Sequence, residues 1–220
     1  MAHRANGRAA FHPLHSPGAT GERSIRIAVL VSGSGTNLQA LVDHAGDGAG
    51  YSIAIVISDR PAVRALERAR QADIPCQIVE WTGDRRSFTA RVCAAATDAG
   101  AEALVLAGFM RILGPEAITR FPDRVLNIHP SLLPAFPGRT PVADTLEHGV
   151  RVTGVTVHFV DERVDHGPII SQEAVEVDPD DTEFTLHQRL HEVEHRLYPE
   201  AVSALAHGRL KVEGRRVVWL

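Results

Sequence analysis

The sequence has few cysteines and no net positive charge, and each shortage excludes a class of protein. Its 220 residues include two cysteines, Cys76 and Cys93, whose spacing fits neither a disulfide framework nor a metal-binding pair. We therefore expect reduced thiols and a cytoplasmic protein. The net charge of −4 supplies no basic field for a nucleic-acid backbone or an anionic membrane. We expect small-molecule partners, with any anionic group bound locally.

The amino-terminal residues 1–24 lack an apolar run long enough for a signal peptide or a membrane span. Arginine, histidine, glycine and proline are scattered through them, so we expect a disordered tail. The remaining residues, 25–220, suit a single α/β domain. A chain of this length with 44% hydrophobic residues buries one sizeable core.

Apolar, β-branched segments alternate with helical segments up to Pro130. Strands are expected from Ile25, from Tyr51, over 76–80, from Ala103 and at RVLNIHP. Helices are expected from Thr36, from Pro61, over 84–99 and from Pro115. This alternation predicts a parallel sheet.

The pattern changes after Pro130. The segments VTGVTVHFV and PIISQEAVEV, separated by the turn-rich stretch 161–167, predict an antiparallel strand pair. A last helix, capped by Asp181 or Thr182, would place apolar residues on one face: Leu186, Leu190, Val193, Leu197, Ala201 and Leu205. A terminal strand is expected around Glu213.

The turn Ser32-Gly33-Ser34-Gly35-Thr36-Asn37 joins the first strand to the first helix and is a candidate phosphate site. Free N–H groups and the helix dipole at such a turn hold phosphate. A nicotinamide dinucleotide competes, because Asp59 ends the second strand as a ribose-binding acid would, but Leu38 stands where the third glycine belongs. On local evidence, phosphate binding and a plain turn stay equally open.

The last expected helix contains HEVEH over residues 191–195, which matches the HExxH zinc-protease pattern. Tyr198 and Ala201 occupy the positions where the extended motif continues with glycine and histidine. Glu213, an acidic residue downstream, falls in the expected terminal strand. We favour a solvated face or a substrate contact, and we keep a zinc peptidase as the rival function.

Asn127 and His129 lie two residues apart at the end of a buried strand, so their side chains point to the same side. There they would reach the crevice in which open α/β sheets bind ligands. Asp165, in the turn Val164-Asp165-His166-Gly167, is a third polar candidate. A structural histidine and an ordinary turn residue are the plain alternatives.

Four segments taken together resemble one enzyme family: SGSGTNLQAL from Ser32, LAGFMRIL from Leu106, NIHPSLLP from Asn127, and VTVHFV followed by Asp165-His166-Gly167-Pro168. The combination resembles the folate-dependent formyltransferases, and SGSGTN favours their glycinamide ribonucleotide branch in purine biosynthesis. The likeness runs from about Ile25 to Leu220. It implies a doubly wound, mostly parallel sheet with helices on both faces and an antiparallel carboxyl-terminal strand pair.

The resemblance also implies a reaction: 10-formyltetrahydrofolate, as co-substrate, gives its formyl group to the amine of glycinamide ribonucleotide or of another acceptor. Gly35, Thr36 and Asn37 would hold the phosphate, and His191 and Glu194 would contact the substrate. The folate would lie against Arg85, Met110, Arg111, Ile112, Leu113, Asn127, Asp161, Val164 and Asp165. No metal or nicotinamide is required, and monomer and homodimer both stay open.

The expected catalytic residues are Asn127, His129 and Asp165. Asn127 would donate a hydrogen bond to the oxyanion of a tetrahedral intermediate. Cationic His129 would stabilise the same charge and protonate the departing folate nitrogen, while Asp165 would favour the cation.

Two positions depart from the family pattern. The family usually carries a histidine just after the Pro-Gly that follows SLLP, whereas this chain continues with Arg139, Thr140 and Pro141. Position 191 is histidine, where relatives often carry glutamine or a longer cationic side chain. We therefore expect loop contacts, and substrate affinity or its pH dependence, to differ.

Overall fold

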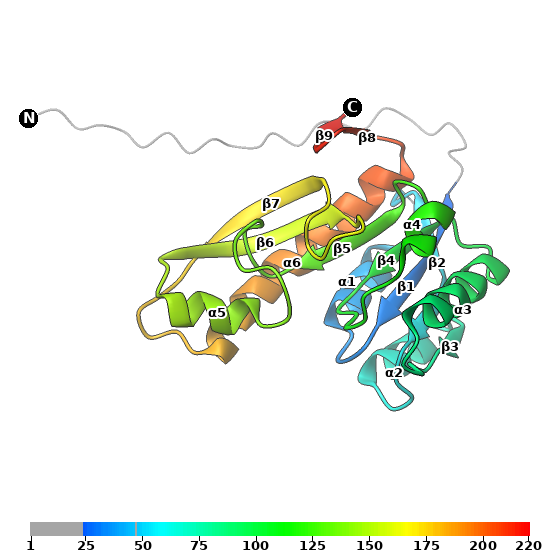
Figure 1. Ribbon diagram of the computed structural model, residues 1–220, viewed down its shortest axis with the longest axis horizontal. Coiled ribbons are helices and arrows are strands. Elements are labelled where there is room, and N and C mark those ends of the chain that lie inside the picture. The colour runs from blue at the N-terminus through cyan, green and yellow to red at the C-terminus, as the bar shows by residue number, and fades with distance from the viewer. Residues whose placement is uncertain (1–23, 47) are drawn as a thin grey trace, which may run out of the picture.

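The computed structural model describes residues 24–46 and 48–220 (Figure 1). Within them, one sheet is built from β1 (Ile25–Val31), β2 (Tyr51–Ser58), β3 (Cys76–Ile78), β4 (Ala103–Leu106), β5 (Val125–His129), β6 (Val152–Phe159), β7 (Ile169–Glu176), β8 (Leu210–Glu213) and β9 (Arg216–Trp219). The strand order is β3-β2-β1-β4-β5-β6-β7-β9-β8. Apart from Ser24, the tail expected over residues 1–24 lies outside the described residues.

The first five strands are parallel, as the sequence predicts. β1 pairs with β2 on one side and with β4 on the other, so the chain winds outward from β1 in both directions. The expectation of a doubly wound sheet is therefore confirmed. Open sheets of this kind bind ligands outside the carboxyl ends of the strands where the winding reverses. Here those ends are Val31 of β1 and Leu106 of β4.

The last four strands complete the sheet in a mainly antiparallel arrangement. β6 and β7 form the predicted antiparallel pair, and β6 also pairs antiparallel with β5. The β5–β6 register sets Asn127 opposite His158. The sequence predicts one terminal strand around Glu213, but the structure has a β8–β9 hairpin there. Gly214, with φ 63°, supplies the left-handed turn that reverses the chain.

Helices on both faces cover the sheet: α1 (Thr36–His44), α2 (Arg64–Gln71), α3 (Arg85–Asp98), α4 (Pro115–Arg120), α5 (Pro141–His148) and α6 (Glu183–Ala206). Thr182 caps α6 in a capping box with Thr185, as the sequence indicates. In the described part of the chain, no helix combines the length and the apolar character needed to cross a membrane.

Two expectations about the helices are corrected. α2 begins at Arg64 and not at Pro61, because the chain bends through residues 59–62 and Val63 is extended, with ψ 144°. α5 is not predicted at all. It is eight residues long and buries only Pro141, Val142 and Thr145, too short a pattern for helical periodicity to show.

Alternate residues of β1 enter two separate cores. Ile27, Val29 and Val31 pack with α1, α2 and α6, whereas Ala28 and Leu30 pack with α3 and α4. Each of these five side chains is fully buried. Burying a valine, leucine or isoleucine side chain stabilises a fold by roughly 1.5–3 kcal/mol. The uninterrupted apolar run of β1 therefore follows from helices on both faces.

Tyr198 fixes α6 against the centre of the sheet. Its buried hydroxyl lies 2.9 Å from the carbonyl oxygen of Leu106 and 3.1 Å from that of Leu126. α6 therefore crosses the carboxyl end of β4 and the body of β5, and Glu194, one turn earlier on the helix, lies near the ends of the parallel strands.

Candidate active site

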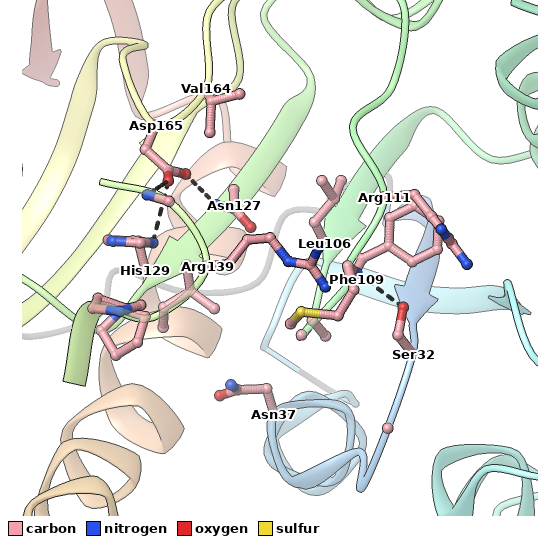
Figure 2. Close-up of a pocket in the computed structure, with 18 of the residues that line it drawn as sticks. Ser32, Asn37, Leu106, Phe109, Arg111, Asn127, His129, Arg139, Val164 and Asp165 are labelled. Carbon is pink, nitrogen blue, oxygen red and sulfur yellow. Dashed lines mark hydrogen bonds and ion pairs between the residues drawn. The ribbon is translucent and has the colours of Figure 1, made fainter. Parts of the chain in front are cut away.

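A cleft of about 780 Å³ opens at the carboxyl ends of β1, β4 and β5 (Figure 2). Its walls come from the β1–α1 turn, the segment after β4, the end of β5, the β5–α5 and β6–β7 loops, and α6. All the residues that the sequence singles out as site residues line it: Gly35, Thr36, Asn37, Arg85, Met110, Arg111, Ile112, Leu113, Asn127, His129, Asp161, Val164, Asp165, His191 and Glu194.

The amino terminus of α1 forms one end of the cleft. Gly35 precedes the helix with φ 73°, and a Cβ placed there would lie 2.7 Å from the Cα of Ala65. Glycine is therefore required both by the left-handed backbone and by the close approach of α2. The first N–H groups of a helix have no partner within it, so this end of α1 presents donors to the cleft.

His129 is buried at the end of β5 and faces an oxygen with each ring nitrogen. Nε2 lies 2.8 Å from the carbonyl oxygen of Phe136, and Nδ1 lies 3.5 Å from Oδ2 of Asp165. A carbonyl oxygen only accepts, so Nε2 carries a proton and donates to Phe136. A second proton on Nδ1 would let the ring satisfy both oxygens at once.

Asp165 lies at the centre of the polar cluster. Its Oδ2 accepts a hydrogen bond of 2.8 Å from the backbone N of Gly138, and its Oδ1 lies 3.5 Å from Nδ2 of Asn127 (Figure 2). The backbone has φ 50°, in the left-handed region that aspartate tolerates better than most residues. Residues held there often belong to functional sites, where the surrounding contacts maintain the strain.

His158 orients Asn127 and was missed by the sequence reasoning. Its Nδ1 lies 2.8 Å from the carbonyl oxygen of Phe159 and so must donate, while burial lowers the pKa of the ring. Nε2 of the neutral ring therefore has a free lone pair and accepts from Nδ2 of Asn127 at 3.1 Å. The available signal was the alternation in VTVHFV, which puts His158 beside the predicted strand residues, but it looked like an ordinary strand position.

Glu194 lines the cleft from α6. Glu194 is 3% exposed, and its carboxyl accepts a hydrogen bond of 2.8 Å from Nδ2 of Asn37. Burial raises the pKa of Glu194 to about 7, and the Asn37 contact opposes that rise. His191 Nε2 lies 3.9 Å from Glu194, and burial, followed by the charges of His187 and His195, lowers the pKa of His191 to about 4. His191 is therefore neutral at neutral pH.

The HEVEH segment lies on α6, with its histidine rings stacked along the helix. The rings of His191 and His195 are 5.6 Å apart between centroids and nearly parallel, at 10°. Among residues 24–46 and 48–220, no group of three or more His, Cys, Asp or Glu side chains is arranged to hold a metal. Glu192, the glutamate of the HExxH pattern, is exposed, whereas Glu194 bonds Asn37.

Asp59, the candidate ribose ligand of a dinucleotide, forms an ion pair with a neighbouring arginine. Its buried Oδ2 accepts a 2.8 Å charged hydrogen bond from Nε of Arg111, whose guanidinium lies 5.2 Å from the centroid of the Trp81 ring. The backbone N of Met110 donates to Oγ of Ser32 at 2.9 Å. These contacts fix the 110–113 segment against the β1–α1 turn, and they give Asp59 a structural role.

Glu194→Gln should make the protein more stable in alkaline solution. A raised carboxyl pKa means that the folded state holds a proton which the unfolded state releases, so stability falls as pH rises from about 4.5 to about 7. A neutral glutamine still accepts from Asn37 and avoids this loss. We expect no gain at pH 4.5 and a gain of roughly 1–3 kcal/mol at pH 8 in urea unfolding. The same change at both pH values would contradict the assignment.

The chain matches known proteins over most of its length. A model of the family described as formyl transferase matches residues 25–202. Phosphoribosylglycinamide formyltransferase of Mycobacterium tuberculosis is 45% identical over 193 residues, which are 86% of this chain and 89% of that protein. The crystal structure of glycinamide ribonucleotide transformylase 1 from Symbiobacterium toebii has a TM-score of 0.88 at 48% identity, covering 91% of this chain and 96% of that one.

A longer relative is similar over nearly the whole chain. The trifunctional purine biosynthetic protein adenosine-3 of Gallus gallus is 40% identical over 220 residues, covering 98% of this chain. The chain spans only 22% of the length of that relative.

Proposed function

Because this chain belongs to the formyl transferase family, we propose that it transfers a formyl group from 10-formyltetrahydrofolate to the amine of glycinamide ribonucleotide. The names of its similar bacterial relatives support this acceptor. The observation that carries the proposal is the meeting of Asn127, His129 and Asp165 in one cleft with the amino terminus of α1. One end suits a phosphate, and the other suits acyl transfer.

The acceptor would lie along the α1 and α6 side of the cleft. Its phosphate would bind the N–H groups at Gly35, Thr36 and Asn37. Glu194 and His191 would contact the ribosyl part, which explains why a buried carboxyl faces the cleft without a charged partner. The acceptor amine would then point toward Asn127 and His129.

The folate would occupy the opposite side. The backbone of Met110, Arg111, Ile112 and Leu113 would bind the pteridine, and Asp161, Val164 and Asp165 would close over it. Arg85 lines this side of the cleft and suits the carboxylates of the glutamate tail, whereas Arg111 is held by Asp59.

The transfer needs charge stabilisation and one proton movement. The acceptor amine attacks the formyl carbon, and the carbonyl oxygen becomes an oxyanion in a tetrahedral intermediate. One N–H of Asn127 is directed to His158. The other has a weak partner, because Nδ2 lies a long 3.5 Å from Oδ1 of Asp165, so this N–H can turn to the oxyanion. His129 adds positive charge beside it and gives a proton to the departing folate nitrogen as the amine loses one. Neither metal nor nicotinamide enters this balance.

We further propose that residues 25–220 form a single domain, because one sheet runs from β1 to β9. Cys76 and Cys93 are both free, which supports a reducing, cytoplasmic location. Small molecules are the proposed partners, with neither nucleic acid nor membrane required. A monomer and a homodimer are equally consistent with a cleft built from one chain.

Gly33→Asp should weaken binding of the acceptor. Gly33 is exposed beside the α1 amino terminus, and a Cβ there meets nothing within 4 Å, so the substitution places a negative charge near the phosphate without a steric conflict. Gly33→Asn is the matched neutral control. We expect the aspartate variant to raise KM for the acceptor roughly tenfold more than the asparagine variant, with KM for folate unchanged. Equal effects of both variants would argue against a phosphate at this turn.

The proposed acceptor is tested by measuring kcat/KM for glycinamide ribonucleotide against a panel of other amines. We expect glycinamide ribonucleotide to be used far better than amines that lack the phosphate. A better non-phosphorylated acceptor would overturn the choice of substrate. Metal analysis of the same sample tests the peptidase reading, for which stoichiometric zinc bound to His191 and His195 would be required.

A further inference from the structure

Arg139, in the β5–α5 loop, lines the cleft, and in Figure 2 its side chain extends across the opening toward Phe109. The loop is held at the transfer site on both sides of Pro137. Phe136 accepts from His129 at 2.8 Å, and Gly138 donates to Asp165 at 2.8 Å. Within residues 24–46 and 48–220, the Arg139 guanidinium makes no hydrogen bond or ion pair. The fold therefore directs a cation without a partner into the site.

The other cationic groups of the cleft are engaged, neutral or distant from α1. Arg111 is bound to Asp59, and Arg163 lies 3.0 Å from Nε2 of His166. Arg85 begins α3, on the side proposed for the folate. His191 is neutral at neutral pH because burial lowers its pKa to about 4. Arg68 lies at the β1–α1 turn, but it is bonded to the carbonyl oxygen of Ser34 and to Gln39. Among the described residues that line the cleft, Arg139 and Arg85 are therefore permanent cations without a protein partner.

We propose that Arg139 binds the phosphate of the acceptor together with the amino terminus of α1. The proposal rests on the function proposed above and names the residue that determines affinity for a phosphorylated amine. In Figure 2 the Arg139 side chain extends from its loop across the cleft toward Phe109 and lies above Asn37 in this view. A planar guanidinium pairs with phosphate through two parallel hydrogen bonds, which a neutral imidazole at position 191 does not supply.

The test compares Arg139→Gln, which removes the charge, with Arg139→Lys, which keeps it. Arg151→Gln is the control for net charge, because Arg151 is exposed and outside the cleft. Arg139→Gln should raise KM for glycinamide ribonucleotide about ten- to a hundredfold and leave kcat and KM for folate nearly unchanged. Arg139→Lys should recover part of the loss, and Arg151→Gln should match the parent.

Glycinamide riboside, the acceptor without its phosphate, tests the role of Arg139 more directly, through the ratio of kcat/KM for the two acceptors. The parent should prefer the phosphorylated acceptor, and Arg139→Gln should lose most of that preference. An unchanged preference would overturn the assignment. A fall in kcat alone would overturn it as well and would indicate a role at the oxyanion, and a rise in KM for folate would overturn it and indicate contact with the folate tail.

The assignment and the proposed function fail separately. If the parent formylates glycinamide ribonucleotide but Arg139→Gln keeps its KM, only the role of Arg139 is wrong. If the parent does not formylate it, the function is wrong, and titration with inorganic phosphate still decides about Arg139. Weaker phosphate binding by Arg139→Gln than by the parent supports the site, and equal binding overturns it.

Discussion

Asn127→Ala should lower kcat by about a hundred- to a thousandfold, the usual cost of removing one oxyanion donor. Asn127 is held in place for this role, because neutral His158 accepts one of its N–H groups and the other has only a long contact, 3.5 Å from Nδ2 to Oδ1 of Asp165. A donor used only in the transition state affects turnover and not ground-state binding, so the dissociation constants of both substrates should stay close to those of the parent.

His158→Phe is a useful companion to Asn127→Ala. It removes the acceptor that orients the amide but leaves Asn127 itself in place. We expect a smaller fall in kcat than for Asn127→Ala. If Asn127→Ala raised KM and left kcat unchanged, Asn127 would be a binding residue and not an oxyanion donor.

Asp165→Asn and His129→Ala should each lower kcat by roughly a hundredfold or more, and the double variant should be little worse than the poorer single one. Asp165 acts on the reaction through His129, whose Nδ1 faces its Oδ2 at 3.5 Å. Once His129 is absent, the charge of Asp165 has nothing left to favour. Residues that act as a unit therefore give losses that do not add.

Asp165→Asn also tests whether the residue has only a structural role. Its side-chain oxygen can still accept from the backbone N of Gly138, so the β5–α5 loop keeps its anchor while the charge is lost. Asp165→Ala loses both. If Asp165→Asn retained full activity and only Asp165→Ala failed, Asp165 would serve only to hold the loop.

Much of the fold follows from local sequence patterns. The apolar runs at Ile25 and Tyr51 are uninterrupted because these strands are buried on both faces. Thr182 caps the last helix through its side-chain hydroxyl. The placement of Asn127 and His129 at a cleft followed from strand alternation and from the open-sheet rule.

The missing parts depend on contacts between distant residues. Asn37 and Glu194 are 157 positions apart, and the packing of α6 against α1 brings the two side chains within 2.8 Å. Local sequence patterns do not predict such a contact. His158 was overlooked for the same reason, since its role comes from Asn127 on the neighbouring strand β5. α5 was missed because eight residues barely exceed two helical turns.

Transfer of a labelled formyl group tests the account most directly. Purified protein is mixed with 10-formyltetrahydrofolate labelled at the formyl carbon and with glycinamide ribonucleotide, and both products are quantified over time. We predict one labelled formyl group on the acceptor nitrogen for each tetrahydrofolate released, with negligible release when the acceptor is absent or when Asn127→Ala replaces the parent. Release of tetrahydrofolate at the same rate without the acceptor, with the label recovered as formate, would contradict the account.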